Sequence, residues 1–515
     1  MVARLTRDLP AYLRTPMTLD EAGRRVRHGL AHRERRFLDL VDRTVYRHAA
    51  SPYRRLLEHA GCERGDLADL VTREGLEGAL EALADRGVYV TYDELKGRRP
   101  AVRGSARFTF SARDFDNPIL KPHYVVFTSG SGGTPSRVRQ SLAYTADGAT
   151  TVALAFDAHG IRNPRNLFWF GPLVTWPLVH LMLGQPIEAW FSPVPSLPPL
   201  AQAALRSMSL LIRASGRRLP MPRFRDLQEP ERVTAWLLDH ADAERPVVVN
   251  LRTSSAVRVA RAAQALGRPL DGVTLHCRGE PLSLARRRHI EQAGARVLTS
   301  YASVELPFVA YLCPLGAEAD DLHLCLNRYA AIGHERPIFE GGPSVESLLL
   351  TSLNGTVAKI ALNTELGDSA RIEQRACGCS LGALGLRTHL SEIRSFEKLS
   401  SEGTTFARGD VLAILEEILP ARFGGSAVDY QLVEEEDAEG ASRLILRVHP
   451  NVGPIDEAAM RAALLEALGR GGPVDAYQAG LLSRAGSIVV RRLPPLATRA
   501  GKVLPFQLLR TAGRT

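Results

Sequence analysis

The sequence predicts an α/β protein with a large N-terminal domain and a small C-terminal α+β domain. Its 515 residues suffice for two or more domains with sizeable cores. Segment 273–299 has the pattern strand, amphipathic helix, strand, and two strands joined by such a crossover run parallel in one sheet. After residue 396 the pattern changes to short helices, at 411–418 and 454–468, and short strands, at 429–434 and 444–449. We therefore expect domains at 1–396 and 397–515.

The composition is that of a globular protein that handles small anions. Hydrophobic residues make up 45% and charged residues 23% of the chain. The net charge is +9, but the basic residues are interleaved with acidic ones, which favours anionic small molecules over nucleic acid. Six unevenly spaced cysteines do not form a secreted disulfide framework. The charged N-terminus lacks the apolar core of a signal peptide.

The most hydrophobic stretch, 166–191, is interrupted by glycine, proline and histidine. It therefore lacks the ~18–20 uninterrupted apolar residues of a membrane span. It is either plain core or, in part, an apolar wall for the body of a substrate. We expect a cytoplasmic protein with no nucleic-acid or membrane partner, and a homodimer is left open.

Residues 18–100 have apolar positions three and four apart, as in Phe37–Val41 and Leu70–Leu83, and are expected to be helical. The arginine-rich segment Arg24–Arg36 is expected to be the solvent-facing side of a helix.

A glycine-rich loop follows the apolar run Tyr124–Phe127, which is expected to be a buried strand. Glycines and a proline at 130–135 favour turns, and the hydroxyl residues between them leave backbone N–H groups free to surround an anion. Arg137 and Arg139 follow directly. A solvated Ser/Gly turn is the alternative.

The strand–helix–strand unit places two further segments at one sheet edge. Ser283 is a good N-cap for the helix and Gly294 a plausible C-cap. Ligands of parallel sheets bind beyond the carboxyl ends of the strands, where Arg278–Pro281 and Ser300–Glu305 are expected.

These segments resemble motifs of the adenylate-forming superfamily, and its phenylacetate-CoA ligase branch most of all. The loop is similar to the superfamily's ATP loop, Arg278–Leu282 to its Gly-Gly-Glu-x-Leu turn beside adenine, and Tyr301–Glu305 to its Tyr-Gly-Ser/Thr-Thr-Glu motif. The resemblance implies that Tyr301 lies against adenine and that Glu305 holds Mg²⁺, a role that suits a carboxylate. It implies ATP binding by Thr128, Ser129, Gly130, Ser131, Gly132, Gly133, Thr134, Gly279, Glu280, Pro281, Ser300, Tyr301 and Ala302.

Three later segments continue the order of the family's motifs. Segment 347–371 is similar to the one that ends in the ribose-binding aspartate, which implies this role for Asp368. Arg394 takes the place of an arginine that reaches ribose or phosphate, just before the hinge. The tail 496–503 is similar to the motif whose lysine, here Lys502, enters the active site when the C-terminal domain rotates.

The resemblance therefore implies an enzyme that uses ATP to activate a carboxylic acid, aryl or otherwise small. An acyl-AMP and pyrophosphate would form, and the acyl group would pass to a thiol, by default that of CoA. An amine or a carrier-protein thiol is an open alternative. Departures from the motifs at Gly132, Ala302, Val304 and Leu366 keep open a non-catalytic nucleotide- or acyl-binding protein.

A structural zinc site is expected from Cys313, His323, Cys377 and Cys379. The glycine between Cys377 and Cys379 lets two thiolates turn toward one ion, and three sulfurs with one imidazole form a closed structural set. A phenylacetate-CoA ligase-like branch has cysteine and histidine at similar places. We expect this site to lie close to Asp368. Cys325 is a less favoured ligand, and four unconnected residues, the cysteines buried as small hydrophobes, are the alternative.

Overall fold

The computed structural model describes residues 1–515 except 128–136, 172, 196, 241–243, 245, 317, 338–343, 396–397, 402–403, 408–410, 412, 426–428, 437–441, 471–472, 497–505 and 509–515. The glycine-rich loop 128–134 and Lys502 thus lie outside the described residues.

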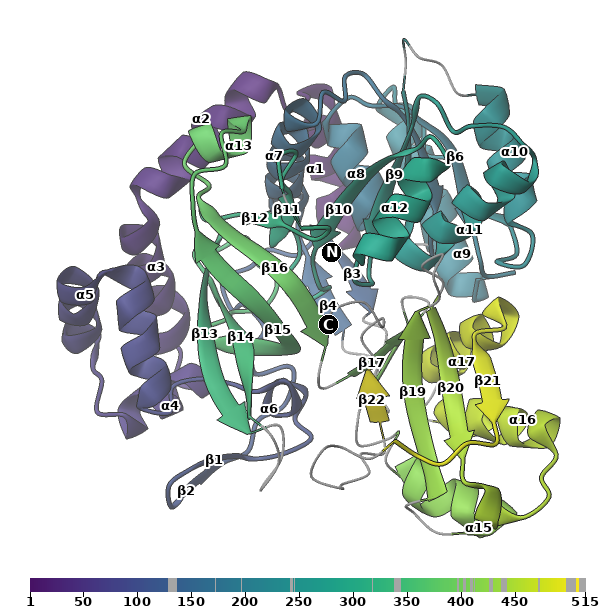
Figure 1. The fold of residues 1–515 in the computed structure, drawn as a ribbon. Coiled ribbons are helices and arrows are strands. Elements are labelled where there is room, and N and C mark those ends of the chain that lie inside the picture. The colour runs from purple at the N-terminus through teal and green to yellow at the C-terminus, as the bar shows by residue number, and fades with distance from the viewer. Residues whose placement is uncertain are drawn as a thin grey trace.

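The fold is mixed α/β, with a large N-terminal unit and a smaller C-terminal α+β unit, as the sequence predicts (Figure 1). The large unit is built on a twelve-stranded sheet. Six neighbouring strands are parallel: β7 (Arg223–Phe224), β6 (Ile187–Ser192), β5 (Arg165–Trp169), β8 (Val247–Arg252), β9 (Val273–Arg278) and β10 (Arg296–Tyr301). The expected strand–helix–strand unit is β9, α12 (Leu284–Gln292) and β10, and Ser283 caps α12 by accepting from the Arg286 N–H.

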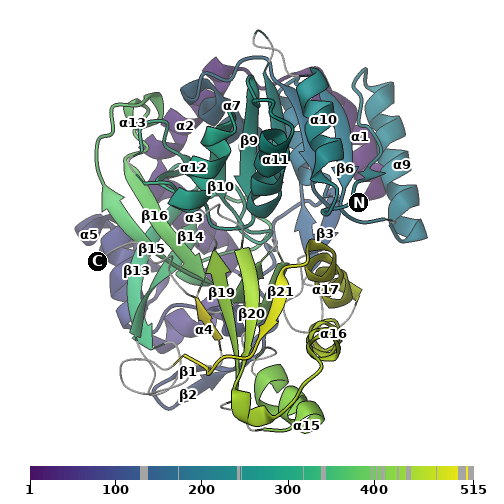
Figure 2. The ribbon, with the colours of Figure 1, turned by 45° about the vertical axis from the view of Figure 1, so that its right-hand side comes forward.

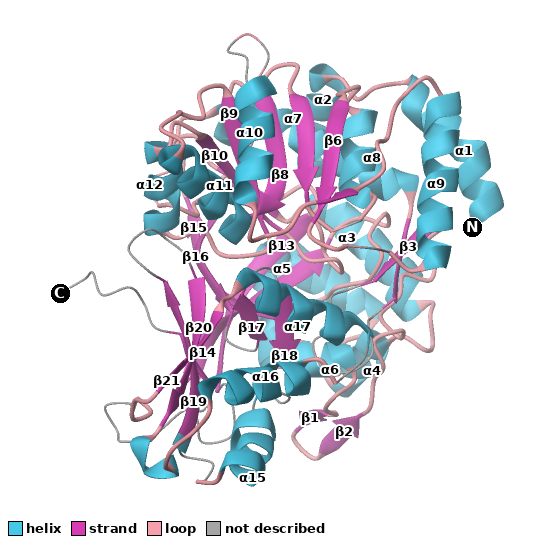
Figure 3. Ribbon diagram, turned by 90° about the vertical axis from the view of Figure 1, so that its right-hand side faces the viewer, coloured by secondary structure: helices cyan, strands magenta, loops and turns pink. Residues whose placement is uncertain are grey.

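Helices cover both faces of the parallel strands (Figure 3). On β8, Val247 and Val249 belong to the hydrophobic cluster under one face, whereas Val248 belongs to the cluster under the other. Such a strand needs no polar positions, which is why its sequence starts with three valines. One face carries α10 (Pro230–His240), α11 (Thr253–Ala265) and α12; the other carries α7 (Leu142–Ala158), α8 (Thr175–Met182), α1 (Val2–Arg14) and α9 (Pro199–Ala214).

Beyond β10 the sheet becomes antiparallel. Its remaining strands, in spatial order, are β11 (Ala310–Leu312), β12 (Leu322–Leu324), β16 (Thr388–Ser395), β15 (Thr364–Gln374), β14 (Ser344–Ser352) and β13 (Tyr329–Pro337). The short helix α13 (Ser380–Ala383) connects β15 to β16. Small two-stranded sheets are formed by β1 (Ala101–Arg103) with β2 (Ala106–Phe108), β3 (Tyr124–Phe127) with β4 (Arg137–Gln140), and β17 (Lys398–Ser401) with β18 (Thr404–Ala407).

The N-terminal segment is helical, as predicted. It forms α2 (Leu19–Ala31), α3 (Arg33–Val41), η1 (Asp42–Tyr46), α4 (Pro52–His59), α5 (Arg64–Asp85) and α6 (Tyr92–Lys96). Arg24, Arg25, Arg27 and Arg35 are exposed, as expected for a solvent-facing side. Arg33 and Arg36 are not, because they donate to the backbone carbonyls of Leu326 and Asn327. No helix within the described ranges combines the length and the apolar character that crossing a bilayer requires.

The C-terminal unit has a four-stranded sheet in the order β21 (Ile488–Arg491), β20 (Ser442–Val448), β19 (Tyr430–Glu436) and β22 (Phe506–Leu508) (Figure 2). Its helices are η2 (Ile414–Ile418), α15 (Leu419–Phe423), η4 (Pro450–Val452), α16 (Glu457–Leu468) and α17 (Pro473–Ala485). It has a hydrophobic core of its own, while Leu481 of α17 packs into the core under α10–α12.

Two predicted C-terminal elements have different bounds in the structure. The helix predicted from Pro454 begins at Glu457, because the Asp456 carboxylate caps it by accepting from the N–H groups of Ala458 and Ala459. In the helix predicted at 411–418, the turn Ile414–Ile418 is a π-helix.

Candidate active site

The candidate site lies at the carboxyl ends of β9 and β10, next to the point where the sheet changes from parallel to antiparallel. The turn after β9 needs glycine, because Gly279 has a φ of +77°. Tyr301 ends β10, and its carbonyl accepts from the N–H of Val309 as the chain turns back into β11. The segments after both strands, predicted from the sequence to share one edge, do lie at the same edge.

Tyr301 and Asp368 meet at this edge although 67 residues separate them. The Tyr301 hydroxyl donates to Oδ2 of Asp368 at 2.8 Å. Burial, followed by the neighbouring Asp368 charge, raises the pKa of Tyr301 well above its ordinary value, so the hydroxyl keeps its proton. Gly367, with a φ of +81°, lies in the irregular part of the β14–β15 pairing, between Glu365 and Ser369. The two residues predicted to hold adenine and ribose thus form one hydrogen-bonded pair.

Arg394 lies on the strand beside Asp368. In the β15–β16 register Ser395 is opposite Asp368, and Arg394 is opposite Ser369. The Arg394 guanidinium donates to Oδ2 of Asp320 at 3.0 Å, and its side chain is 42% exposed. Asp320 also accepts from the backbone N–H of Ile393. Asp320 therefore orients Arg394, a role for which the sequence gives no signal because the two are distant in the chain.

Glu305 is buried in an ion pair with Lys96. The Lys96 ammonium donates to Oε1 of Glu305, and the side chains are only 11% and 9% exposed. Burial acts to raise the pKa of Glu305, but the attraction of Lys96 outweighs it, so the pKa of this carboxyl is lowered. The pKa of Lys96 is raised, because the Glu305 charge outweighs burial. Lys96 ends α6, 209 residues from Glu305, and was missed by the sequence analysis.

This pair bears on the magnesium role predicted for Glu305. An ammonium already neutralises the carboxylate at the position where a cation would bind. Lys359, paired with Asp116 at 2.8 Å, acts on Glu305 as a second positive charge. In this arrangement the donor set does not fit a magnesium ion, because Lys96 would have to leave first. No step below depends on a metal at Glu305.

The remaining described residues of the predicted site also lie at this edge, but their polar side chains contact other protein groups. The Glu280 carboxylate accepts from the backbone N–H of Ser254, at 2.8 Å, and from its hydroxyl, so it caps the start of α11. The Pro281 carbonyl accepts from Arg286, and the Ser300 hydroxyl lies 3.2 Å from Nε2 of His276. Gly279 and Ala302 contribute only backbone and a methyl group. The turn after β9 can therefore contact a nucleotide only through its backbone N–H and carbonyl groups.

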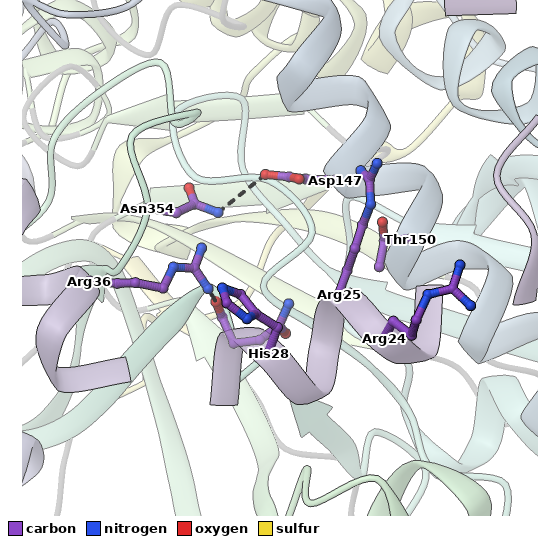
Figure 4. A pocket seen from close by; sticks show the side chains of 8 residues that line it. Arg24, Arg25, His28, Arg36, Asp147, Thr150 and Asn354 are labelled. Atoms are coloured by element: carbon purple, nitrogen blue, oxygen red, sulfur yellow. Dashed lines mark hydrogen bonds between the residues drawn. The ribbon is translucent and has the colours of Figure 1, made fainter. Parts of the chain in front are cut away.

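A cavity of about 380 Å³ lies elsewhere, between α2, α3, α7 and two loops. It is lined by Arg24, Arg25, His28, Arg36, Asp147, Thr150, Asn327 and Asn354 (Figure 4). Arg24 and Arg25 both pair with Glu21, and Asp147 accepts from the Asn354 amide at 3.2 Å. No predicted site residue lines this cavity, and Arg24, Arg25 and Asp147 have charged partners outside its lining.

The expected cysteine–histidine cluster converges. One possible ligand atom each of Cys313, His323, Cys377 and Cys379 lies within 4.8 Å of the other three. Nε2 of His323 lies 3.1 Å from the Cys379 sulfur and 3.6 Å from the Cys377 sulfur, and the two sulfurs are 3.3 Å apart. Ligands of a tetrahedral zinc ion with bonds of ~2.0–2.3 Å lie about 3.6–3.8 Å apart, so these side chains are close to a ligand set. Cys325 is outside the cluster.

The His323 ring is oriented for metal binding. Its Nδ1 lies 2.6 Å from the Leu386 carbonyl oxygen, which can only accept a hydrogen bond. The hydrogen is therefore on Nδ1, and the Nε2 lone pair faces the sulfurs. Such a backbone contact commonly fixes the tautomer of a metal-binding histidine.

The cluster does not lie close to Asp368, contrary to expectation. Cys377 and Cys379 follow β15 beyond Gln374, whereas Asp368 is six residues before this end. At ~3.3 Å per residue these positions are about 20 Å apart. The two ends of an extended strand lie far apart. The sequence had suggested that the cluster is close to Asp368 only because the length of β15 was unknown.

We expect the buried Lys96–Glu305 pair to be a large stability determinant. Lys96→Met should lower the free energy of unfolding by about 3–5 kcal/mol, because it leaves a buried carboxylate without its partner. The double variant Lys96→Met/Glu305→Gln should recover most of this loss. Urea unfolding measures both, with Arg43→Met, which breaks the exposed pair with Asp39, as a control that changes little. Equal losses in the single and double variants would contradict the coupling.

The same pair gives a pH dependence. Because the pKa of Glu305 is lowered on folding, its stabilisation is present above the ordinary glutamate pKa of about 4.3 and is lost as the pH falls through the lowered value. Because the pKa of Lys96 is raised on folding, its contribution to stability is present below about pH 10.4 and is lost as the pH rises through the raised value. The free energy of unfolding of the wild type, relative to that of the double variant, should therefore be constant between these limits and fall outside them.

Comparisons with known proteins complete the description. No protein-family model matches the chain, and no curated protein matches its sequence. Similar solved structures include 2-hydroxyisobutyryl-CoA ligase in complex with 2-HIB-AMP and CoA, at 16% identity over 96% of this chain and 91% of that one, with a TM-score of 0.49. Malonyl-CoA ligase with methylmalonyl-CoA and AMP has 16% identity, coverages of 83% and 89%, and a TM-score of 0.40. The amide bond synthetase McbA from Marinactinospora thermotolerans has 13% identity, coverages of 94% and 97%, and a TM-score of 0.42. At these identities, and with TM-scores below 0.5, the activity has to be inferred from the residues of this chain.

Proposed function

We propose that the chain is an adenylate-forming ligase that activates a small carboxylic acid with ATP. The observation that carries this proposal is the pairing of Tyr301 with Asp368 at the carboxyl edge of the parallel strands. A ring and a carboxylate held together suit a nucleoside, because the ring offers a flat face to the base and the carboxylate accepts from ribose hydroxyls. Motifs far apart in the sequence supply the two residues.

In the proposed reaction the substrate carboxylate attacks the α-phosphorus of ATP. The bond to the bridging oxygen breaks, and acyl-AMP and pyrophosphate result. The barrier lies largely in bringing two anions together, so alignment and positive charge supply most of the catalysis. We assign the nucleoside to Tyr301 and Asp368, a ribose or phosphate contact to Arg394, the phosphates to 128–134, and the charge on the reacting groups to Lys502.

Two domains, 1–396 and 397–515, are consistent with these roles: the first would bind ATP and the acid, and the second would supply Lys502. The contacts of α17 with the large unit lie near the carboxyl edge, where Arg258 of α11 donates to the Ala485 carbonyl. A rotation of the C-terminal domain would bring Lys502 to the site for the first half-reaction and remove it for the second. In the second, a thiol, by default that of CoA, would attack the acyl carbon and release AMP. An amine or a carrier-protein thiol would attack the acyl carbon in the same way.

A second candidate, nucleotide binding without adenylation, is favoured by the Lys96–Glu305 pair. This pair occupies the carboxylate that the resemblance assigns to Mg²⁺. Exchange of radiolabelled pyrophosphate into ATP, measured with a panel of carboxylic acids, separates the two candidates. Acid-dependent exchange is expected for the ligase, whereas ATP binding with no exchange for any acid would favour the binder. AMP release on addition of CoA, or of an amine, then identifies the acceptor.

Lys502→Ala should slow acid-dependent exchange by about 100-fold or more, the size of effect that removing one charge-stabilising group has in other enzymes. Consumption of a chemically prepared acyl-adenylate should change much less, because the lysine is expected to have left by then. The matched control is Lys121→Ala, an exposed lysine of the large unit. Normal exchange by the Lys502 variant would refute the assigned role.

Asp368→Ala should weaken ATP binding by about 10- to 100-fold, because hydrogen bonds to a charged acceptor contribute about 1.5–3 kcal/mol. Isothermal titration calorimetry with ATP measures this, and Asp69→Ala, which removes an exposed carboxylate from α5, is the control. An unchanged affinity would remove Asp368 from the ribose site.

We also propose that Cys313, His323, Cys377 and Cys379 hold a structural zinc ion. The support is the convergence of one imidazole and three sulfurs, with the His323 tautomer fixed by Leu386. Three thiolates and one imidazole leave no open position, so the ion would stabilise the loops after β11 and β15 and take no part in catalysis.

Metal analysis of the purified protein should find about one zinc per chain. A Cys377→Ser/Cys379→Ser variant should lose it and unfold at a lower temperature, because zinc that binds only the folded state stabilises that state. Cys325→Ala, a buried cysteine outside the cluster, should keep the metal. Stable, metal-free wild-type protein would end the proposal.

A further inference from the structure

Arg278, the last residue of β9, places a buried guanidinium at the candidate site. The residue is 5% exposed. Its guanidinium carbon lies 3.6 Å from the ring centroid of Trp176, so the ring covers one face of the cation. Nη2 donates to the side-chain oxygen of Asn250 on β8 at 3.0 Å. The side chain is thus held between α8 and the neighbouring strand.

The rest of the guanidinium has no hydrogen-bond partner among the described residues. Nε and Nη1, which carry three of its five N–H donors, are buried and make no hydrogen bond to any described residue. Within the described ranges no carboxylate forms an ion pair with Arg278; the nearest acidic residue in sequence, Glu280, is committed to Ser254. Burial lowers the pKa of Arg278 to about 9, so the group is still charged at neutral pH. A buried cation without a counter-charge is costly unless something else supplies one.

Two partly buried aromatic rings border the Arg278 guanidinium. In the aromatic stretch 166–191, Phe168 and Trp169 are fully buried core, whereas Phe170 and Trp176 are only partly buried. These two partly exposed rings are the ones that Arg278 contacts, at 5.4 and 3.6 Å. Of the two interpretations of this stretch, core therefore holds for Phe168 and Trp169, and an apolar wall fits Phe170 and Trp176.

Arg278 lies on β9, the strand next to β10, but its guanidinium is directed toward β8. Its contacts lie toward β8 and β5, whereas Asp368, the partner of Tyr301, lies on β15, on the other side of β10. With strands spaced ~4.8 Å apart, β8 is about 10 Å from β10. The carboxylate that is activated has to reach the nucleotide, so a substrate carboxylate bound at Arg278 would be a second one.

We propose that Arg278 binds a second carboxylate of the acid substrate, so that the substrate is a dicarboxylic acid whose body lies against Trp176 and Phe170. A planar guanidinium matches a carboxylate in geometry and charge. The aromatic walls suit a methylene or aryl body. This inference rests on the proposed function, since it names the class of acid that the ligase would take.

The test uses pairs of acids with one skeleton, each monoacid beside the diacid that carries a second carboxylate: butyrate with glutarate, and phenylacetate with 4-carboxyphenylacetate. Two measurements are made on the full-length protein, the acid-induced shift of the unfolding temperature and pyrophosphate exchange. We expect one of the diacids to raise the unfolding temperature, and its kcat/KM in exchange to exceed that of its monoacid by at least 100-fold.

Arg278→Met, which keeps the length of the side chain and removes its charge, should lower this preference at least 100-fold and abolish the temperature shift. Arg278→Lys should restore part of the preference. Arg288→Met, the same change at an exposed arginine of α12, is the control and should leave the preference intact.

The outcomes separate this inference from the proposed function. Exchange with monoacids that equals exchange with their diacids, or an unchanged preference in Arg278→Met, overturns the inference and leaves the ligase standing. No diacid-induced shift in the wild type also overturns it. A shift that depends on Arg278, without exchange for any acid, supports the diacid site and overturns the ligase.

Discussion

The parallel half of the sheet is buried on both faces, and this constraint determines where polar chemistry can occur. Strand β8 contributes Val247 and Val249 to one core and Val248 to the other, so helices have to cover both sides. Polar side chains then have one accessible place, the edge where the strands end. Asn250, Arg278 and Tyr301 all lie at or near the carboxyl ends of their strands.

Charges near this edge differ in how they are compensated. Glu305 is neutralised by Lys96, and the buried Glu365 is held by Arg336 through two hydrogen bonds of 2.7 Å each. Among the described residues, the Arg278 guanidinium contacts only two aromatic rings and one amide oxygen. These ion pairs matter for the stability of the fold, because removing either partner would leave the other charge buried and unpaired. A buried charge without a charged partner can instead bind a ligand of opposite charge.

The cysteine–histidine cluster and the nucleotide pair occupy opposite ends of one strand. Asp368 is near the beginning of β15, and Cys377 follows its end. The cluster joins the ends of β11, β12 and β15, so its contribution is to the antiparallel half of the sheet. It is connected to the nucleotide pair by β15 and β16, which lie side by side from Asp368 to Gln374, and by β11, whose Ala310 is paired with Tyr301.

The sequence by itself determined the elements and their order. Local patterns suffice for this: valine runs, the Ser283 cap and the glycines after β9 and α12 act on neighbouring residues, so the βαβ unit and its edge could be predicted. The cysteine–histidine cluster could be predicted too, because its residue types are rare, Cys377 and Cys379 are two residues apart, and the resemblance has cysteine and histidine at similar places. Only the tertiary structure decided which charges meet. Lys96 and Glu305, Arg394 and Asp320, and Arg278 and Trp176 are far apart in the chain, and their contacts depend on the packing of whole helices and strands. The length of β15 likewise separated the cluster from Asp368, since a fully extended chain carries its ends apart.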